Sequence, residues 1–500
     1  MKQRFPSLFY NPLSMFGAII AIVNFVTIVA LILLDSFAGG LAPYAGIIAF
    51  IILPAILILG LIFIPVGMYI ERGRRIRHKG EEARSFYVDL GKPSHRFATM
   101  VFSTGTVIFL LSTAVGSYRA YEFTESVTFC GQICHEVMEP EYAAYQYSPH
   151  ARVTCAECHV GPGAGWFVRS KLSGTYQVYA TTLNLYPKPI PTPIENLRPA
   201  RETCEECHWP DKFHGSQERI FNHYMVNEEN TKWPIRMLIK TGGGSKEAGI
   251  AEGIHWHMNI ANEVDYIATD EHREQIAWVR VRDHEGNVRE YVSEDNPIDP
   301  EDFDKYEMRR MDCIDCHNRP THIYRSPSKA MNMAFDAGWI DPTLPSAKRI
   351  GIEALIGEYP STDSAMIAIA NKIRESYEEE YPEVLETRKD AVEQMIAGVQ
   401  EIYRRNFFPA MNVRWDTYPD HIGHFLSPGC YRCHNGRFVS EDGSVISDDC
   451  TSCHIILSQG NETDSQLVDP NGMEFRHPVD IEEAWREMAC SECHTGTSQL

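Results

Sequence analysis

The stretch CAECH, Cys155–His159, decides the fold because its pattern recurs along the chain. Six runs share the spacing Cys-x-x-Cys-His, and they begin at Cys155, Cys204, Cys313, Cys430, Cys450 and Cys490. A seventh run, CGQICH from Cys130 to His135, has one extra residue between its cysteines. The seven runs together use all fourteen cysteines of the chain. Every cysteine therefore belongs to one repeated chemical unit.

The repeated unit predicts covalently attached haem c. Two cysteines can form thioethers with the haem vinyl groups, and the histidine directly after the second cysteine is placed to bind the iron. Zinc sites and disulfides also use paired cysteines, but neither requires a histidine after each pair. We expect seven haems. The expected attachment residues are Cys130, Cys134, Cys155, Cys158, Cys204, Cys207, Cys313, Cys316, Cys430, Cys433, Cys450, Cys453, Cys490 and Cys493, and the expected proximal ligands are His135, His159, His208, His317, His434, His454 and His494.

The N-terminal region predicts a membrane anchor. Residues 13–34, 45–70 and 97–117 are uncharged apolar segments, each long enough to cross a bilayer. The alternative, a buried apolar domain behind a cleavable leader, would require soluble protein to cover three such segments in the first 118 residues. We therefore expect three membrane helices.

Basic residues predict the orientation of this anchor. Lys2 and Arg4 precede the first helix, and the loop 71–96 carries eight lysines and arginines against four acids. The positive-inside rule places both in the cytoplasm, so the cysteine-containing part should lie outside the inner membrane, in the periplasm. The formal net charge of −21 makes that exported part acidic and favours basic partners, such as small periplasmic c-type cytochromes, over nucleic acid.

A low-spin haem needs a second axial ligand, and eleven exported histidines lie outside the motifs. Four of them stand in short constrained segments near a motif: His150, His322, His424 and His477. In IHWHM, residues 254–258, a strand would put His255 and His257 on one face, and we expect one of them, with a preference for His257, to be a ligand. We expect surface or hydrogen-bonding roles for His214, His223, His272, His284 and His421.

The exported part divides by its motifs. The expected segments are an anchor at 1–118 with the cytoplasmic loop 71–96, a three-haem module at 119–215, a β-containing insertion at 216–312 that supplies distal ligands, haem four with a helical spacer at 313–429, and a three-haem cluster at 430–500. Residues 276–292 read as two strands around a turn, and residues 362–406 as two helices interrupted at Pro382. The expected fold is a three-helix membrane anchor followed by a mainly α, haem-packed region with a small β insertion.

From Cys130 to Pro210 the chain resembles the NapC/NirT family of membrane-anchored multihaem quinol dehydrogenases, which includes NrfH-like cytochromes. The matching text is CHEVM, YQYSPHARVTCAECHVGPG, RSKLSG and CEECHWP. Three membrane helices before seven haem motifs are similar to the layout of ImcH-type inner-membrane cytochromes. The resemblance implies roles for three residues: Met138 as an axial ligand of the first haem, Lys171 as a ligand of the second, and His150 as a distal ligand of a haem other than the adjacent one.

The chain departs from that family in two places. Both gaps of the first motif are one residue longer than in the family pattern, so either His135 or Met138 could bind the first iron. An acidic residue that the family places near the first haem is replaced within TYQVY, residues 175–179. The quinol pocket of the family therefore does not transfer in detail.

The resemblance and the first motif's closeness to the membrane favour oxidation of menaquinol, with electrons passing to periplasmic cytochromes or a reductase in anaerobic or extracellular respiration. Met138, His135 and Lys171 are the expected quinol-side residues. Unusual ligation of the first haem would set its potential for this step. Two alternatives stay open: an electron-transfer wire fed by a partner membrane subunit, and a terminal multihaem reductase.

Overall fold

The computed structural model describes residues 5, 7–38, 48, 52–79, 89–133, 135–194, 198–242, 253–258, 262–283, 285–461 and 467–497. Cys134, His284, the expected helix start at Ala45 and residues 80–88 of the basic loop lie outside these ranges, as does the side chain of His135. The chain forms two compact units, one of Met1–His135 with Thr154–Ala156, and one of Glu136–Val153 with Glu157–Leu500.

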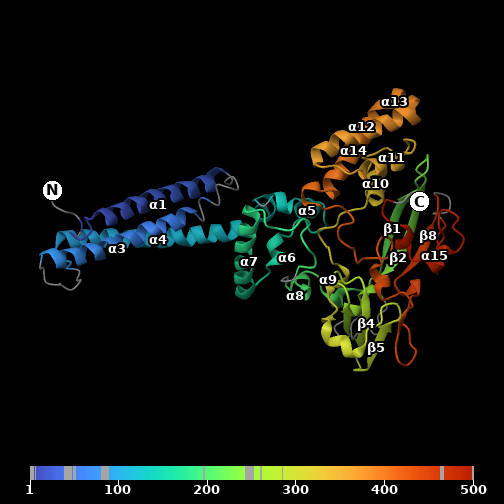
Figure 1. Cartoon of the computed structure of the whole chain (residues 1–500), viewed down its shortest axis with the longest axis horizontal. Coiled ribbons are helices and arrows are strands. Elements are labelled where there is room, and N and C mark those ends of the chain that lie inside the picture. The colour runs from blue at the N-terminus through green and yellow to red at the C-terminus, as the bar shows by residue number, and fades with distance from the viewer. Residues whose placement is uncertain are drawn as a thin grey trace. The chain divides into compact units, whose positions relative to one another are not determined.

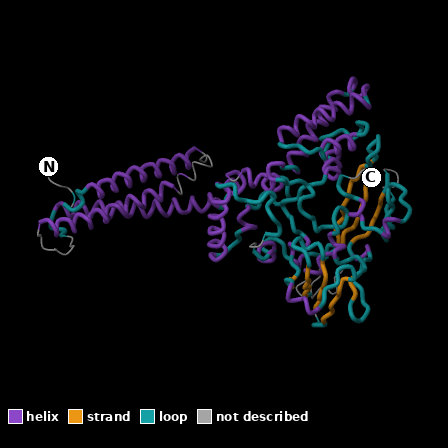
Figure 2. Tube along the Cα trace, viewed as in Figure 1, coloured by secondary structure: helices purple, strands orange, loops and turns teal. Residues whose placement is uncertain are grey.

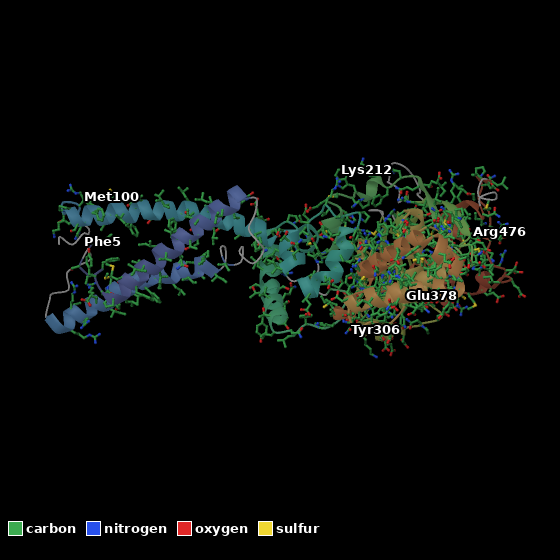
Figure 3. All side chains as sticks on the ribbon, turned by 90° about the horizontal axis from the view of Figure 1, so that it is seen from above. Phe5, Met100, Lys212, Tyr306, Glu378 and Arg476 are labelled. Atoms are coloured by element: carbon green, nitrogen blue, oxygen red, sulfur yellow. The ribbon has the colours of Figure 1, made fainter. Side chains whose placement is uncertain are left out.

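Three long apolar helices confirm the expected membrane anchor (Figure 1). They are α1 (Pro12–Ala38), α3 (Leu53–Lys79) and α4 (Pro93–Thr124), and each contains a segment long and apolar enough to span a bilayer. The third helix extends past the expected boundary at residue 118 and ends six residues before Cys130. The apolar side chains of α4 are largely uncovered by protein, as at Met100, which is labelled in Figure 3. This exposure suits a helix that contacts lipid.

Small residues let α1 and α3 approach closely. A Cβ atom on Gly17 would lie 2.6 Å from the carbonyl oxygen of Gly60, and one on Gly60 would lie 2.9 Å from the backbone nitrogen of Ala21. The Ser14 hydroxyl donates to the Ile64 carbonyl at 2.8 Å across the same interface. Such small-residue contacts, with a polar bond between helices, are typical of membrane helix pairs.

The second unit combines short helical segments around the motifs with two sheets (Figures 1 and 2). Its helices before the sheets are α5 (His135–Gln146), α6 (Cys155–His159), α7 (Ala164–Thr182), α8 (Ala200–Cys204) and η3 (Pro210–Lys212), the first two starting in the first unit. Later short helices are η4 (Ile254–Met258), η5 (Pro300–Lys305), α9 (Cys313–Cys316), η6 (Pro409–Met411), η7 (Gly429–Arg432), η8 (Cys450–Ser452), α15 (Ala484–Glu487) and α16 (Cys490–Cys493).

The described part of the insertion contributes most strands of both sheets. One sheet has the order β1 (Ser216–Tyr224), β2 (Lys232–Lys240), β8 (His454–Gln459). The other has the order β6 (Met308–Arg310), β3 (Glu263–Ala268), β4 (Ile276–Arg282), β5 (Val288–Ser293), β7 (Phe438–Val439). The expected antiparallel hairpin is confirmed in β4 and β5, which pair from Trp278 with Val292 to Arg282 with Val288. Because β7 and β8 come from the last segment of the chain, the insertion and that segment share both sheets.

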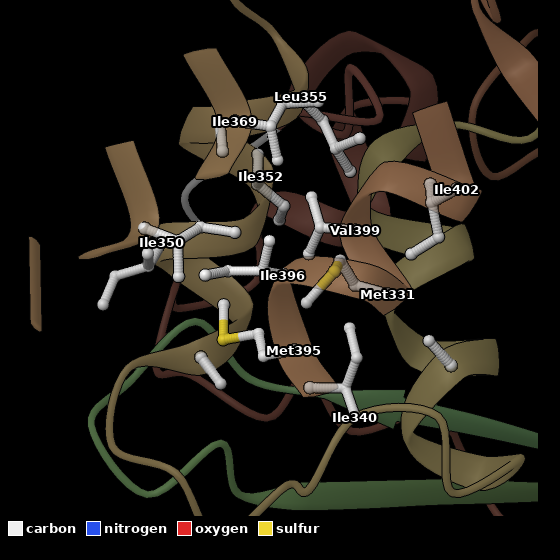
Figure 4. Close-up of a cluster of buried hydrophobic side chains, with 14 of the residues drawn as sticks. Met331, Ile340, Ile350, Ile352, Leu355, Ile369, Met395, Ile396, Val399 and Ile402 are labelled. Atoms are coloured by element: carbon white, nitrogen blue, oxygen red, sulfur yellow. The ribbon is translucent and has the colours of Figure 1, made fainter. Parts of the chain in front are cut away.

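A helical bundle without cysteines holds the largest protein core (Figure 4). It consists of α10 (Pro327–Asp336), α11 (Ala347–Leu355), α12 (Thr362–Glu380), α13 (Pro382–Thr387) and α14 (Lys389–Asn406). The interruption expected at Pro382 is confirmed, and α13 separates the two longer helices there. Buried apolar side chains include Met331, Ile350, Ile369, Met395 and Val399, all with no exposed surface. Their regular spacing in α12 and α14 explains why this part was predictable from its pattern.

The segment with the first three motifs has a much sparser core. Between residues 125 and 215, the described apolar side chains that are buried are Val137, Ala144, Tyr145, Ala156, Ala180 and Ala200. Most of these are alanines, which bury little area. Protein side chains alone therefore supply little hydrophobic stabilisation to this segment.

We expect Gly17→Leu to destabilise the anchor by about 1–3 kcal/mol, because the larger side chain overpacks the α1–α3 contact. The measurement is the temperature at which half of the detergent-solubilised protein is lost from the monodisperse size-exclusion peak. Gly105→Leu is the matched control, since a Cβ atom there meets nothing within 4 Å. Equal midpoints for the two variants would contradict the tight helix contact.

Candidate metal centres

Five of the six regular motifs adopt single helical turns that bring their two cysteines to one side. In the third motif, Cys204 is the last residue of α8 and residues 205–207 form a turn. α6, α9 and α16 are short α-helical turns, and η7 and η8 are 3-10 turns. Residues three apart are neighbours on such a turn. The local backbone is thus suited to bind two adjacent vinyl groups of one haem.

The first motif differs in its backbone. Phe129–Ile133 forms a π-helix, η2, which is a wider turn than an α-helix. A wider turn takes up the extra residue of CGQIC. The longer spacing is therefore absorbed locally, immediately before the position of Cys134.

This motif is tied to the end of the third membrane helix within the first unit. The Cys130 amide donates to the Ser126 carbonyl at 3.2 Å, and the Phe129 amide donates to the Ser126 hydroxyl at 3.1 Å. The rings of Phe123 and Phe129 make an edge contact at 5.5 Å. Cys130 is therefore held close to the end of α4.

Each of the other six motif histidines faces a second histidine ring. The pairs and their centroid separations are His159 with His322 at 6.3 Å, His208 with His150 at 6.0 Å, His317 with His255 at 6.4 Å, His434 with His257 at 5.8 Å, His454 with His424 at 6.2 Å, and His494 with His477 at 5.9 Å. All twelve rings lie in the second unit.

These separations fit one iron between two imidazoles. A metal–imidazole bond is about 2 Å long and the nitrogen lies about 1 Å from the ring centre, so opposed ligands place their ring centres roughly 6 Å apart. A porphyrin supplies the other iron ligands, so two protein ligands suffice. Among the described residues, no three His, Cys, Asp or Glu side chains form a group able to hold a metal ion. The residues present therefore fit haem.

Backbone carbonyls orient several of these rings. In five of the rings, Nδ1 lies 2.7–3.1 Å from a backbone carbonyl oxygen. The contacts are His255 with Thr241, His257 with Ile254, His322 with Glu141, His434 with Ser447 and His477 with Val479. When Nδ1 carries the proton, it donates a hydrogen bond to the carbonyl, and Nε2 is then the basic nitrogen that can bind a metal.

Burial favours the neutral form of several of the paired rings, and this is the form that binds a metal. Burial lowers the pKa of His159, and the neighbouring His322 lowers it further. Burial, with a contribution from His434, lowers the pKa of His257 to about 4. Burial also lowers the pKa values of His424 and His454. These rings are therefore unprotonated at neutral pH.

The strand expected around His255 and His257 is wrong. Ile254–Met258 forms the 3-10 helix η4. Each residue of a 3-10 helix turns by about 120°, so side chains two residues apart point about 120° away from each other rather than to one face. His255 consequently faces His317 and His257 faces His434, so both rings of IHWHM meet a motif histidine.

A buried carboxylate joins the five-stranded sheet to the fourth motif. Asp315, 2% exposed, accepts hydrogen bonds from the Tyr266 hydroxyl at 2.8 Å and from Arg309 at 2.9 Å, and pairs with Arg273 at 3.2 Å. Arg432, from the fifth motif, donates to the Asp315 carbonyl at 2.7 Å. The sheet thus fixes the fourth and fifth motifs against each other.

Neighbouring motifs also meet through their first cysteines. The Cys130 and Cys155 thiols are hydrogen-bonded within the first unit, and Cys204 and Cys313 are hydrogen-bonded within the second. Burial raises the pKa of Cys316 to about 11, and the nearby Cys430 contributes to this rise. Motifs separated in sequence are therefore adjacent in space.

The remaining candidate residues occupy varied positions. His214 and His272 are exposed, and His223 is half-buried. His421 is 4% exposed; its Nδ1 lies 3.2 Å from the Asp315 carbonyl, and its buried Nε2 has no hydrogen-bond partner in the described structure. The sequence carried no signal that separated His421 from surface histidines.

Met138 and Lys171 lie on helices of the second unit. Met138 is half-buried in α5. The Lys171 ammonium lies 4.9 Å from the centre of the Phe167 ring in its own helix, α7. The ring opposite His159 is that of His322, from a segment 163 positions later in the chain.

Comparison with known proteins identifies the family. Residues 92–189 match the N-terminal region of the NapC/NirT cytochrome c family. The chain is 47% identical over 493 residues to the cytochrome c-type protein ImcH of Geobacter sulfurreducens, covering 98% of this chain and 96% of ImcH. It is 35% identical over 78 residues to the cytochrome c-type protein NrfH of Wolinella succinogenes, covering 15% of this chain and 44% of NrfH. No solved structure matches the chain.

The family explains both halves of the chain. A cytochrome c binds haem covalently, as the Cys-x-x-Cys-His motifs require. The three apolar helices hold the protein in the bacterial inner membrane, with the haem region in the periplasm. Because the ImcH match spans nearly the whole of both sequences, this chain belongs to the ImcH-type multihaem cytochromes c of the NapC/NirT family, which are membrane-anchored electron-transfer proteins.

Proposed function

We propose that this protein is a seven-haem quinol dehydrogenase, which oxidises menaquinol at the periplasmic face of the inner membrane. Oxidation of one menaquinol to menaquinone releases two electrons and two protons. The protons pass to periplasmic water, and the electrons leave singly to a periplasmic cytochrome or reductase. When bound, haem c supplies the one-electron centre at each motif.

The observation that carries this proposal is the short connection between α4 and the first motif. Only five residues lie between Thr124 and Cys130, and hydrogen bonds donated to Ser126 by the Phe129 and Cys130 amides hold that connection. Quinol is confined to the bilayer, so an electron acceptor for it must lie at the membrane surface. Cys130 meets this requirement because its backbone continues from a membrane helix.

The histidine pairs supply the axial ligands of six haems in this proposal. In each pair, the histidine outside the motif would be the second ligand of the haem at that motif. The proposed second ligands are His322 for the motif of His159, His150 for His208, His255 for His317, His257 for His434, His424 for His454 and His477 for His494. Two imidazoles give an iron without an open position. These six sites are thereby suited to electron transfer rather than to substrate binding.

The first haem is the exception. His135 directly follows Cys134, and Met138 lies one further turn along α5. A methionine or a weakly bound ligand raises the potential of a haem relative to two imidazoles, which favours electron acceptance. In this proposal His322 takes the position opposite His159, and Lys171 acts on the quinol side without binding the second iron.

The cysteine contacts support an order for some of the electron carriers. Cys130 with Cys155 would join the first and second sites, and Cys204 with Cys313 the third and fourth. Cys316 near Cys430 would continue to the fifth. The fourth motif then links the membrane-side sites to the last three.

Surface charge supports basic periplasmic cytochromes as acceptors. The chain carries 67 acidic against 46 basic residues. Exposed carboxylates concentrate on α12 and α13, at Glu375, Glu378, Glu379, Glu383 and Glu386. An acidic surface speeds encounter with a basic partner at low ionic strength. We interpret the carboxylates of these two helices as a contribution to the negative electrostatic field of the whole surface, rather than as a dedicated binding site.

Two rival functions make different demands. A terminal reductase needs an open iron far from the membrane, and the paired histidines argue against one at the second to seventh motifs. A wire fed by another membrane subunit needs no quinol contact at all. Direct reduction by quinol therefore separates the wire from the main proposal.

The haem count tests the cofactor assignment. We expect seven haem groups per chain in the intact mass and in the pyridine haemochrome spectrum, and six in the double variant Cys130→Ala, Cys134→Ala. The variant retains every regular motif, so its remaining haems serve as the internal control. Six haems in the unaltered protein would show that the wide first motif is not used.

The two histidines of η4 test the ligand assignment. We expect His255→Ala and His257→Ala each to convert one ferric haem from low spin to high spin, and the double variant to convert two, because the rings face different motifs. Electron paramagnetic resonance measures the high-spin fraction. The control is His272→Ala, an exposed position expected to leave the spectrum unchanged. A silent single variant would mean that only one ring is a ligand.

Stopped-flow reduction tests the proposed activity. We expect anaerobic menaquinol analogue to reduce the oxidised protein rapidly, and Met138→Ala to slow this by about tenfold or more, equivalent to about 1.4 kcal/mol of barrier. Met333→Ala, at an exposed methionine of the helical bundle, is the matched control. Normal reduction by dithionite without any reduction by quinol would overturn the proposal and favour the wire.

A further inference from the structure

The helix α7 carries an uncovered apolar stripe. The stripe consists of four side chains at spacings of four, four and three residues, which places them on one helix face: Val168, Leu172, Tyr176 and Tyr179. All four are exposed, with Leu172 at 69% and Tyr176 at 67%. The helix buries Ala180 on another side. The stripe is therefore directed away from the protein that packs against α7.

Basic residues border this stripe on both sides. Arg169 and Lys171 lie at the two edges of the face in a helical projection. The Arg169 guanidinium lies 5.1 Å from the Trp166 ring and the Lys171 ammonium 4.9 Å from the Phe167 ring. These contacts place aromatic rings beside each cation.

The charge of α7 contrasts with the rest of the chain. Residues 164–182 contain two basic and no acidic side chains, within a protein of formal charge −21. The opposite face carries the polar residues Ser170, Ser173 and Gln177, with the Trp166 and Phe167 rings beside them. A helix with an apolar face, flanking basic and aromatic residues and a polar back is typical of helices that lie in the headgroup region of a bilayer.

We propose that α7 is an interfacial helix that docks the haem region on an anionic phospholipid surface. The apolar stripe would enter the boundary between headgroups and acyl chains, and Arg169 would bind a lipid phosphate. The chain supports this occupant, because α7 begins 40 residues after the last membrane helix ends and is tethered to that membrane. The proposal is independent of quinol oxidation, since a wire would need the same docking.

The test uses the full-length, haem-loaded protein in nanodiscs of phosphatidylethanolamine and phosphatidylglycerol. Leu172→Cys carries a nitroxide label on the stripe, and Gln177→Cys carries it on the opposite face. Both positions are exposed, so the two variants are matched. The readout is the ratio of oxygen to nickel-complex collision rates with the label, and an unchanged reduced haem spectrum establishes folding.

We expect the ratio to be several-fold higher at residue 172 than at 177, because oxygen concentrates in lipid and the nickel complex in water. Tyr176→Cys repeats the measurement on the same stripe. Equal, water-like ratios at 172 and 177 would overturn the proposal. A residue 172 shielded from both reagents would also overturn it, since porphyrin or a second protein copy would then cover the stripe.

The lipid charge is tested separately. Adding Arg169→Gln to the Leu172→Cys protein should lower the ratio in the anionic nanodiscs and leave it unchanged in pure phosphatidylcholine. If Arg169→Gln left the ratio unchanged in the anionic nanodiscs as well, the role of lipid phosphates would be overturned. Neither result depends on reduction by quinol, so failure here is distinguishable from failure of the proposed function.

Discussion

The arrangement of the haem region depends on one distance, the roughly 6 Å that separates two imidazole rings bound to the same iron. Six histidine pairs adopt this separation, and most join segments that are distant in sequence. His322 stands 163 positions from His159, and His434 stands 177 from His257. Each such pair would act as a cross-link if it bound one iron, because metal binding that requires the folded geometry contributes its free energy to folding.

This constraint explains the uneven distribution of the protein core. The cysteine-free bundle of α10 to α14 buries a continuous set of apolar side chains, whereas the segment of the first three motifs buries mainly alanines. A chain with little apolar volume of its own must obtain stabilisation elsewhere. Covalent porphyrins would supply both the missing apolar volume and the long-range connections.

The ligand supports are built from backbone and buried charge rather than from apolar packing. Carbonyl groups lie within hydrogen-bonding distance of the Nδ1 atoms of five paired rings, an arrangement that would leave Nε2 available to a metal. Asp315 is held by Tyr266, Arg273 and Arg309, and this ties the sheet to the fourth motif. Such satisfied buried networks define one geometry, because a partly satisfied network is costly in a low-dielectric interior.

The sequence by itself determined the features that depend on nearby residues. The Cys-x-x-Cys-His runs, the three apolar helices, the hairpin at residues 276–292 and the break at Pro382 all follow from local spacing or length, and the structure has the helices, hairpin and break. The sequence also supplied the candidates for distal ligands, because composition limits them to a few histidines. Only the tertiary structure decided which ring faces which motif, that His255 and His257 point to different motifs, and that His421 is buried. The reason is that the pairing of rings depends on the path of the backbone between segments that are distant in sequence. The directions of His255 and His257 also depend on the 3-10 turn at Ile254–Met258, where the alternating positions of the two histidines had suggested a strand.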